Sequence, residues 1–110
     1  MIAWTLLLLA QMLTANLSKN NLVWSWKGTP QAGVSEFDIK CGPTPRNYTK
    51  VTTVTDPTAR QVSVLSAVGG EGIWYCAVFA ANKTGASAYS DEINFRAGWL
   101  PAGPTNLSIE

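Results

Sequence analysis

The chain of 110 residues contains no histidine, and charged residues make up only 14% of it. Without histidine, the commonest general base and metal ligand is missing. The formal net charge is +1, and the eight basic residues are interleaved with acidic ones along the chain. No basic stripe suited to a phosphate backbone results. We therefore expect a protein that is not an enzyme, with no cofactor, no metal site and no nucleic-acid partner.

The remaining reactive side chains also give little support for catalysis. Two cysteines 35 positions apart do not form a zinc motif, and no histidine is present to activate Cys41 as a nucleophile. The neighbouring acids Asp91 and Glu92 would point to opposite faces of a strand, so they would not form an acid/base pair. We expect these two carboxylates to be surface charges at the start of a strand.

Apolar residues, in contrast, make up 46% of the chain, enough for the core of one domain. Between Asn20 and Phe95 they form short runs separated by turn residues, a pattern typical of an all-β sandwich or barrel. The expected strands cover residues 22–26, 36–41, 48–55, 62–64, 74–81 and 88–95.

The fifth of these runs is the most regular. One of its faces carries Trp74, Cys76, Val78 and Ala80, and the other carries Tyr75, Ala77, Phe79 and Ala81. Asn82 then suits the first position of a type I turn, and Gly85 can take the positive φ that closes a four-residue hairpin with a bulge. We therefore expect the chain to reverse there and residues 88–95 to return alongside.

The order of these short motifs matches a known family. The matching residues are Trp26, Gly33, Phe37-Asp38-Ile39, Trp74–Ala80, Asn82, Gly85, Ser87 and Tyr89-Ser90-Asp91-Glu92. Together they resemble a fibronectin type III domain of the variety common in bacterial and phage proteins, over roughly residues 20–96. The resemblance implies an all-β fold, an immunoglobulin-like antiparallel β-sandwich of about seven strands, with residues 16–96 as the domain.

The resemblance also implies roles for particular residues. Trp26 would be the buried tryptophan of strand B, and Phe37 and Ile39 the inward residues of strand C. Trp74 and Val78 would face the same core from strand F. Trp74 stands where the family usually has a tyrosine whose hydroxyl holds a corner, and an indole offers only an N–H donor. The corner bond is therefore expected to be lost or changed.

On the same reading, Cys41 and Cys76 point inward from neighbouring strands. A disulfide between them would contribute roughly 4 kcal/mol in the loop-entropy model. The alternative is two buried thiols that act as small apolar side chains. Both readings stay open, because cross-strand geometry is demanding and the compartment is unknown.

The amino-terminal segment, residues 1–15, is apolar almost throughout and includes Trp4 and Leu7. It resembles a secretory signal, with Leu13-Thr14-Ala15 as a cleavage site, but no lysine or arginine precedes the apolar run. As a helix it would reach about 22 Å, short of the roughly 30 Å hydrocarbon core, so a membrane span is not expected. We expect the segment to be retained and buried as an anchor, with cleavage as the alternative.

Residues 97–110 are expected to form an extended tail, because glycine and proline recur from Gly98 to Pro104. Thr105 to Ile109 looks like the first strand of another such domain, which can pair with a neighbour's open sheet edge or remain a loose tail. Asn-X-Ser/Thr triplets begin at Asn16, Asn47, Asn82 and Asn106, either by chance or as glycan acceptors.

Tyr75 and Phe79 would stand on the outer face of the sheet, either as a contact patch or covered by the chain's own loops. The candidate contact residues are thus Tyr75, Phe79, Trp4, Leu7, Trp99 and Leu107. We expect a structural module held among protein subunits of a larger assembly, including further copies of itself, such as a phage or virus particle with a decorated or cemented capsid or tail. The alternative is a secreted or periplasmic module that binds a glycan or a protein.

Overall fold

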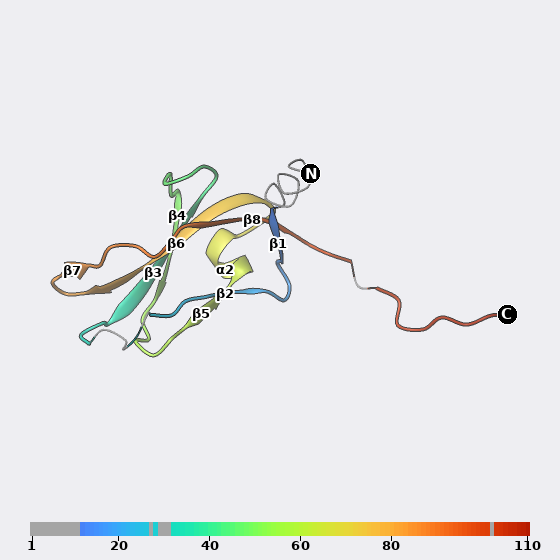
Figure 1. Cartoon of the computed structure of the whole chain (residues 1–110), viewed down its shortest axis with the longest axis horizontal. Coiled ribbons are helices and arrows are strands. Elements are labelled where there is room, and N and C mark those ends of the chain that lie inside the picture. The colour runs from blue at the N-terminus through green and yellow to red at the C-terminus, as the bar shows by residue number, and fades with distance from the viewer. Residues whose placement is uncertain (1–11, 27, 29–31, 102) are drawn as a thin grey trace, which may run out of the picture.

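The computed structural model describes residues 12–26, 28, 32–101 and 103–110. Trp4 and Leu7 lie outside these residues. The elements follow in the order β1 (Leu13–Asn16), β2 (Asn21–Val23), β3 (Glu36–Gly42), β4 (Lys50–Val54), β5 (Gln61–Ser63), α2 (Val64–Val68), β6 (Gly72–Asn82), β7 (Gly85–Ala86) and β8 (Ile93–Gly98). Strands dominate this part of the chain (Figure 1), and the expected all-β class is confirmed.

The larger sheet has the strand order β1-β8-β6-β3-β4, with β7 also paired to β6. β3 is antiparallel to both of its neighbours, and β6 is antiparallel to β8. β1, in contrast, runs parallel to β8. The sheet is therefore mixed, and the expectation of a purely antiparallel arrangement is wrong at this edge. Side-chain alternation has the same period in both pairings and does not distinguish them.

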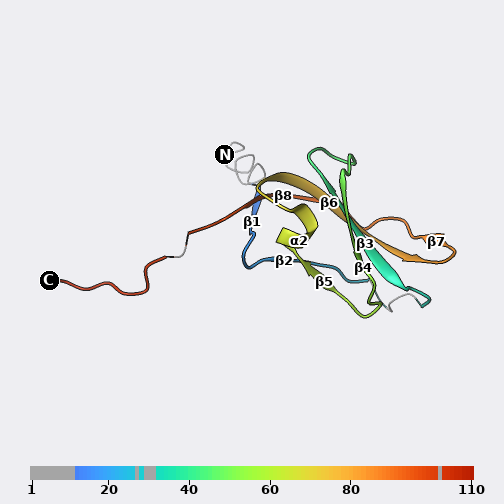
Figure 2. The same ribbon diagram turned by 180° about the vertical axis from the view of Figure 1, so that it is seen from behind.

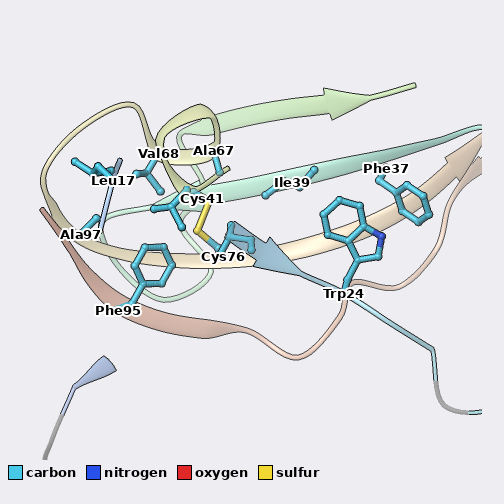
Figure 3. Close-up of a cluster of buried hydrophobic side chains, with 12 residues drawn as sticks. Leu17, Trp24, Phe37, Ile39, Cys41, Ala67, Val68, Cys76, Phe95 and Ala97 are labelled. Atoms are coloured by element: carbon cyan, nitrogen blue, oxygen red, sulfur yellow. A yellow bond between two sulfur atoms is a disulfide. The ribbon is translucent and has the colours of Figure 1, made fainter. Parts of the chain in front are cut away.

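The smaller sheet contains β2 and β5, paired antiparallel with Leu22 opposite Val62. Together with α2 it lies against one face of the larger sheet, as the opposite views in Figures 1 and 2 show. One core cluster joins the two sheets and the helix (Figure 3). Its buried members are Leu17, Leu22, Trp24, Phe37, Ile39, Cys41, Val64, Ala67, Val68, Cys76, Phe95 and Ala97.

The core encloses a different tryptophan from the one expected: Trp24 in place of Trp26. Phe37 and Ile39 are buried, with 1% and 0% of their surface exposed. The tryptophan buried with them is Trp24, whereas Trp26 is half-buried at the edge of the cluster. Both indoles contact the Phe37 ring, at centroid distances of 5.1 and 5.6 Å. Because β2 ends at Val23, the strand's own alternation does not decide which of the two lies deeper.

The expected strand 62–64 gives way to a helix at Val64. Ser63 caps this helix: its hydroxyl accepts a hydrogen bond from the backbone N–H of Ser66 at 3.0 Å. The helix buries Val64, Ala67 and Val68, the spacing of one helical face. Gly69 ends it in the left-handed conformation, with φ of 82°. Val62 and Val64 had indicated a strand because they stand two positions apart. The helical spacing appears only when Ala67 and Val68, further along the chain, are included.

The chain reverses at the expected place after β6. Asn82 and Gly85 form the last pair of the hairpin, and the Asn82 side-chain oxygen accepts hydrogen bonds from the N–H groups of Thr84 and Gly85, at 2.8 and 3.3 Å. The returning strand is broken, however, into β7 and β8. β8 continues to Gly98, two residues beyond the expected domain end at residue 96.

Candidate contact surfaces

The two cysteines are joined in the structure by a disulfide that holds β3 to β6. Cys41 and Cys76 form a directly opposed pair in the ladder, with their Cα atoms 4.2 Å apart. Both side chains are buried beneath α2 and the smaller sheet (Figure 3). The sulfur atoms are therefore engaged inside the core and available neither as a nucleophile nor as a metal ligand.

Trp74 makes a side-chain hydrogen bond at the start of β6. Its indole N–H donates to the carbonyl oxygen of Gly70, four residues upstream, at 3.2 Å. Trp74 and Val78 are half-buried and pack against the core cluster without being enclosed by it. Trp24, in contrast, is buried, and its Nε1 has no hydrogen-bond partner among the described residues.

The outer face of the larger sheet carries a row in which two aromatic rings lie between two cations. Lys40 places its Nζ 4.6 Å from the centre of the Phe79 ring, and Phe79 packs against Tyr89 at a centroid distance of 5.3 Å. The Arg46 guanidinium lies 4.2 Å from the centre of the Tyr89 ring. We call these four residues the cation–aromatic row. Such contacts are favourable by about 0.5–1 kcal/mol each at exposed sites.

Of the two aromatics expected on this face, neither stands free. Phe79 is half-buried between Lys40 and Tyr89, and Tyr75 is half-buried opposite Gly42. Tyr89 is the most exposed of these three aromatic residues, with 41% of its surface exposed. The sequence had shown Tyr89 only as part of a strand motif, because its position over Phe79 depends on the break between β7 and β8.

Glu92 holds Arg46, at one end of the cation–aromatic row, through a hydrogen bond and an ion pair. Its carboxylate accepts hydrogen bonds from the Tyr48 hydroxyl and from the backbone N–H of Arg46, at 2.9 Å for the latter, and lies 3.8 Å from the Arg46 Nε. The Tyr48 hydrogen bond lowers the pKa of Glu92. Burial, together with the bond to Glu92, raises the pKa of Tyr48 to about 12. Glu92 is thus a structural link between two loops, whereas Asp91 is an exposed surface charge as expected.

Two serine side chains close the gap between β7 and β8. The Ser90 hydroxyl accepts from the N–H of Val78 at 2.9 Å, and the Ser87 hydroxyl accepts from the N–H of Ala80 at 3.0 Å. The backbone N–H groups of the same serines donate to the carbonyl oxygens of Val78 and Ala80. The backbone N–H and C=O groups of Val78 and Ala80 are therefore hydrogen-bonded within the chain, and this part of β6 offers no open ladder to another strand.

Several strongly exposed apolar side chains lie toward the two ends of the described chain. Leu13 is 67% exposed in β1, and Trp99 is 53% exposed just after β8. Leu107 and Ile109 are fully exposed. The tail that bears them has no strand of its own and runs away from the sheets (Figure 1). The expected contact residues Trp99 and Leu107 thus lie on an extended segment outside the core.

The residues that the structure describes hold no group of three or more cysteine, aspartate and glutamate side chains placed to bind a metal ion. They also include no helix with the length and hydropathy needed to cross a bilayer.

No family model, curated protein or solved structure matches this chain. The fibronectin type III resemblance therefore rests on the sequence motifs alone.

Proposed function

We propose that this chain is a fibronectin type III-like β-sandwich that serves as a non-enzymatic structural module in a larger assembly. The most fitting assembly is a phage or virus particle whose capsid or tail the module decorates or cements. Other protein subunits, including further copies of this chain, would be its partners. The observation that carries the proposal is the full exposure of Leu107 and Ile109 on a segment outside the core.

The arrangement of strands is compatible with the proposed sandwich. A mixed sheet with β8, β6, β3 and β4 as neighbours faces a pair formed by β2 and β5, and one cluster fills the space between them. The indole of Trp74 bonds to a carbonyl upstream, in the manner of the family's corner tyrosine.

The proposed mechanism is burial of apolar surface at the ends of the module. Two exposed side chains such as Leu107 and Ile109 would each contribute about 1.5–3 kcal/mol if fully buried against a partner. The cross-linked module would act as a rigid body, because the disulfide holds β3 to β6 next to the core. The ends would then determine where the module is attached.

Truncation tests this proposal. Deleting residues 1–12 leaves all of β1 in place, so the domain should fold with an unchanged circular dichroism spectrum. We expect this variant to be absent from particles purified from the natural source. Normal incorporation of both this variant and a second one lacking residues 105–110 would refute the proposal.

A second candidate function is a secreted or periplasmic module that binds a glycan or a protein. The observation that favours it is an open groove beside Trp24 and Trp26, lined on its other side by the segment Ser87–Ser90. The buried disulfide also fits an oxidising compartment.

The intact mass of the protein from its natural source separates the two candidates. A mass near 11.8 kDa would mean that residues 1–15 are retained, as the assembly proposal requires. A mass lower by the first 15 residues would mean a cleaved signal and would favour the secreted module. Cleavage after Ala15 would also remove three of the four residues of β1.

A further inference from the structure

The tail repeats three residues that stand at the end of β1, the first edge strand of the sheet. Asn106-Leu107-Ser108 is identical to Asn16-Leu17-Ser18, at a distance of 90 positions. The two central leucines have opposite environments. Leu17 is 2% exposed within the core cluster, and Leu107 is 100% exposed. A sequence that fits the core is thus present a second time without a core around it.

The first copy shows what this sequence does beside β8. β1 runs parallel to β8, and the N–H of Leu17 donates to the carbonyl oxygen of Gly98 at 2.9 Å. Leu17 then enters the core near Ala97 and Val68 (Figure 3). The Asn16 side-chain oxygen accepts from the backbone N–H and hydroxyl of Ser18, at 3.0 and 2.8 Å, which ends the strand. The triplet Asn-Leu-Ser alone supplies these side chains.

Pro104 in the tail would be compatible with the position that β1 occupies beside β8. Aligning the two triplets places Pro104 at the position of Thr14 and Thr105 at that of Ala15. The N–H of Asn16 points away from β8, since it donates to the Asn20 side chain. Because alternate residues of a strand face the same side, the N–H of Thr14 also points to the open edge. A proline there loses no ladder hydrogen bond.

The tail of one chain does not reach this place in its own sheet. Thr105 would have to lie beside Ala97, as Ala15 does, and only residues 98–104 connect the two positions. Parallel neighbours need a crossover of about a dozen residues or more. Pro101 and Pro104 stiffen this short connection further. The partner of the tail must therefore be another molecule.

We propose that residues 105–108 bind beside β8 of a second copy of this chain, in the register of Ala15–Ser18, with Leu107 in the place of Leu17. This inference rests on the proposed function, which makes the ends the points of assembly, and it names the partner and the groove. The resident β1 competes for the same place. Weakening or removing β1 therefore shifts the equilibrium toward exchange between chains.

Variants of the full chain test this competition. In Leu17→Ala the resident segment loses its buried side chain, so the tail of a second copy should bind in its place. We expect this variant to dimerise or polymerise in light scattering after size-exclusion chromatography. Adding Leu107→Asp should weaken this association at least about tenfold, a change of about 1.4 kcal/mol. Adding Ile109→Asp instead, at an equally exposed site, should leave it unchanged. Equal association of both double variants would overturn the inference.

A photo-crosslinking residue at position 107 of the otherwise unchanged chain gives a second measurement that does not depend on Leu17→Ala folding. Crosslinks between chains should map to Ile93–Gly98, and the same residue at position 109 should give few of them. Crosslinks that map elsewhere, or none at concentrations where the chain associates, would refute the inference. If the crosslinks refute the inference but the chain is still incorporated normally into particles, the proposed function stands. Failure of the inference can thus be told apart from failure of the proposed function.

Discussion

The indole N–H of Trp74 donates to the carbonyl oxygen of Gly70, 3.2 Å away and four residues earlier in the chain. This bond fastens the start of β6 to the turn that follows α2. Neither group makes another hydrogen bond among the described residues. The relationship makes the role of Trp74 testable by substitution.

Trp74→Phe should destabilise the domain by about 1 kcal/mol, because the Gly70 carbonyl loses its donor. That loss corresponds to a fall in Tm of roughly 4–8 °C for a domain of this size. Thermal unfolding followed by circular dichroism measures it. Trp99→Phe is the matched control, since Trp99 is 53% exposed and should change stability by less than about 0.5 kcal/mol. An unchanged Tm for Trp74→Phe would show that the bond contributes nothing.

Removing the disulfide should have a larger effect. The double variant Cys41→Ala/Cys76→Ala should lose roughly 2–4 kcal/mol of unfolding free energy, because the unfolded chain is no longer cross-linked. Urea titration gives this value from the midpoint and slope. The unsubstituted protein, unfolded with and without reductant, is the control for the small cavities that two alanines leave. Equal midpoints in the two conditions would contradict a stabilising disulfide.

The burial of Tyr48, together with its hydrogen bond to Glu92, should make stability depend on pH at both extremes. The pKa of Tyr48 rises from 10.0 to about 12 on folding, so its contribution is complete below pH 10 and is lost as the pH rises through about 12. The pKa of Glu92 is lowered from 4.5, so its contribution is present above that pH and is lost as the pH falls below it.

Ultraviolet titration of the tyrosines and urea unfolding at several pH values measure these dependences. Tyr48→Phe should remove the alkaline limb attributed to this residue and weaken the acid limb, because Glu92 loses its strongest partner. Tyr89→Phe is a suitable control, since the Tyr89 hydroxyl takes no part in the Glu92 cluster. A Tyr48 that titrates near pH 10 would rule out the bond.

The serine closure of β6 predicts a local effect on amide exchange. Ser90→Ala leaves the N–H of Val78 without its acceptor, so that amide should exchange with solvent faster. The loss of stability should be about 0.5–1.5 kcal/mol. Hydrogen exchange read by NMR resolves Val78 from Ile39, its neighbour across the ladder, which should be unaffected. Ser108→Ala in the exposed tail is the control, and equal protection of Val78 in both variants would argue against the closure.

Alternation along the chain was sufficient to predict β3 and β6. In each, every second side chain from Phe37 or Trp74 belongs to the core cluster or packs against it, and this period is set locally by the pleat. Turn chemistry was similarly sufficient at Asn82, where a side-chain oxygen satisfies two backbone donors within three residues. These features depend on neighbours in sequence, so the sequence alone contains their cause.

Among the candidate contact residues, Trp99 and Leu107 are exposed in the structure. The sequence did not show that Tyr89 is more exposed than Phe79. Phe79 lost its exposure because Lys40 and Tyr89 cover it, and both come from other segments of the chain. Which aromatic ring remains accessible depends on contacts between segments, which no local pattern records.

The sequence by itself determined the β class, the two long central strands and the turn between β6 and β7. Only the tertiary structure decided that β1 pairs parallel to β8, that Val64 begins a helix, and that Trp24 is buried more deeply than Trp26. The physical reason is the same in each case. Strand period and turn chemistry act over two to four neighbouring residues, whereas pairing direction and burial depth depend on partners from distant parts of the chain.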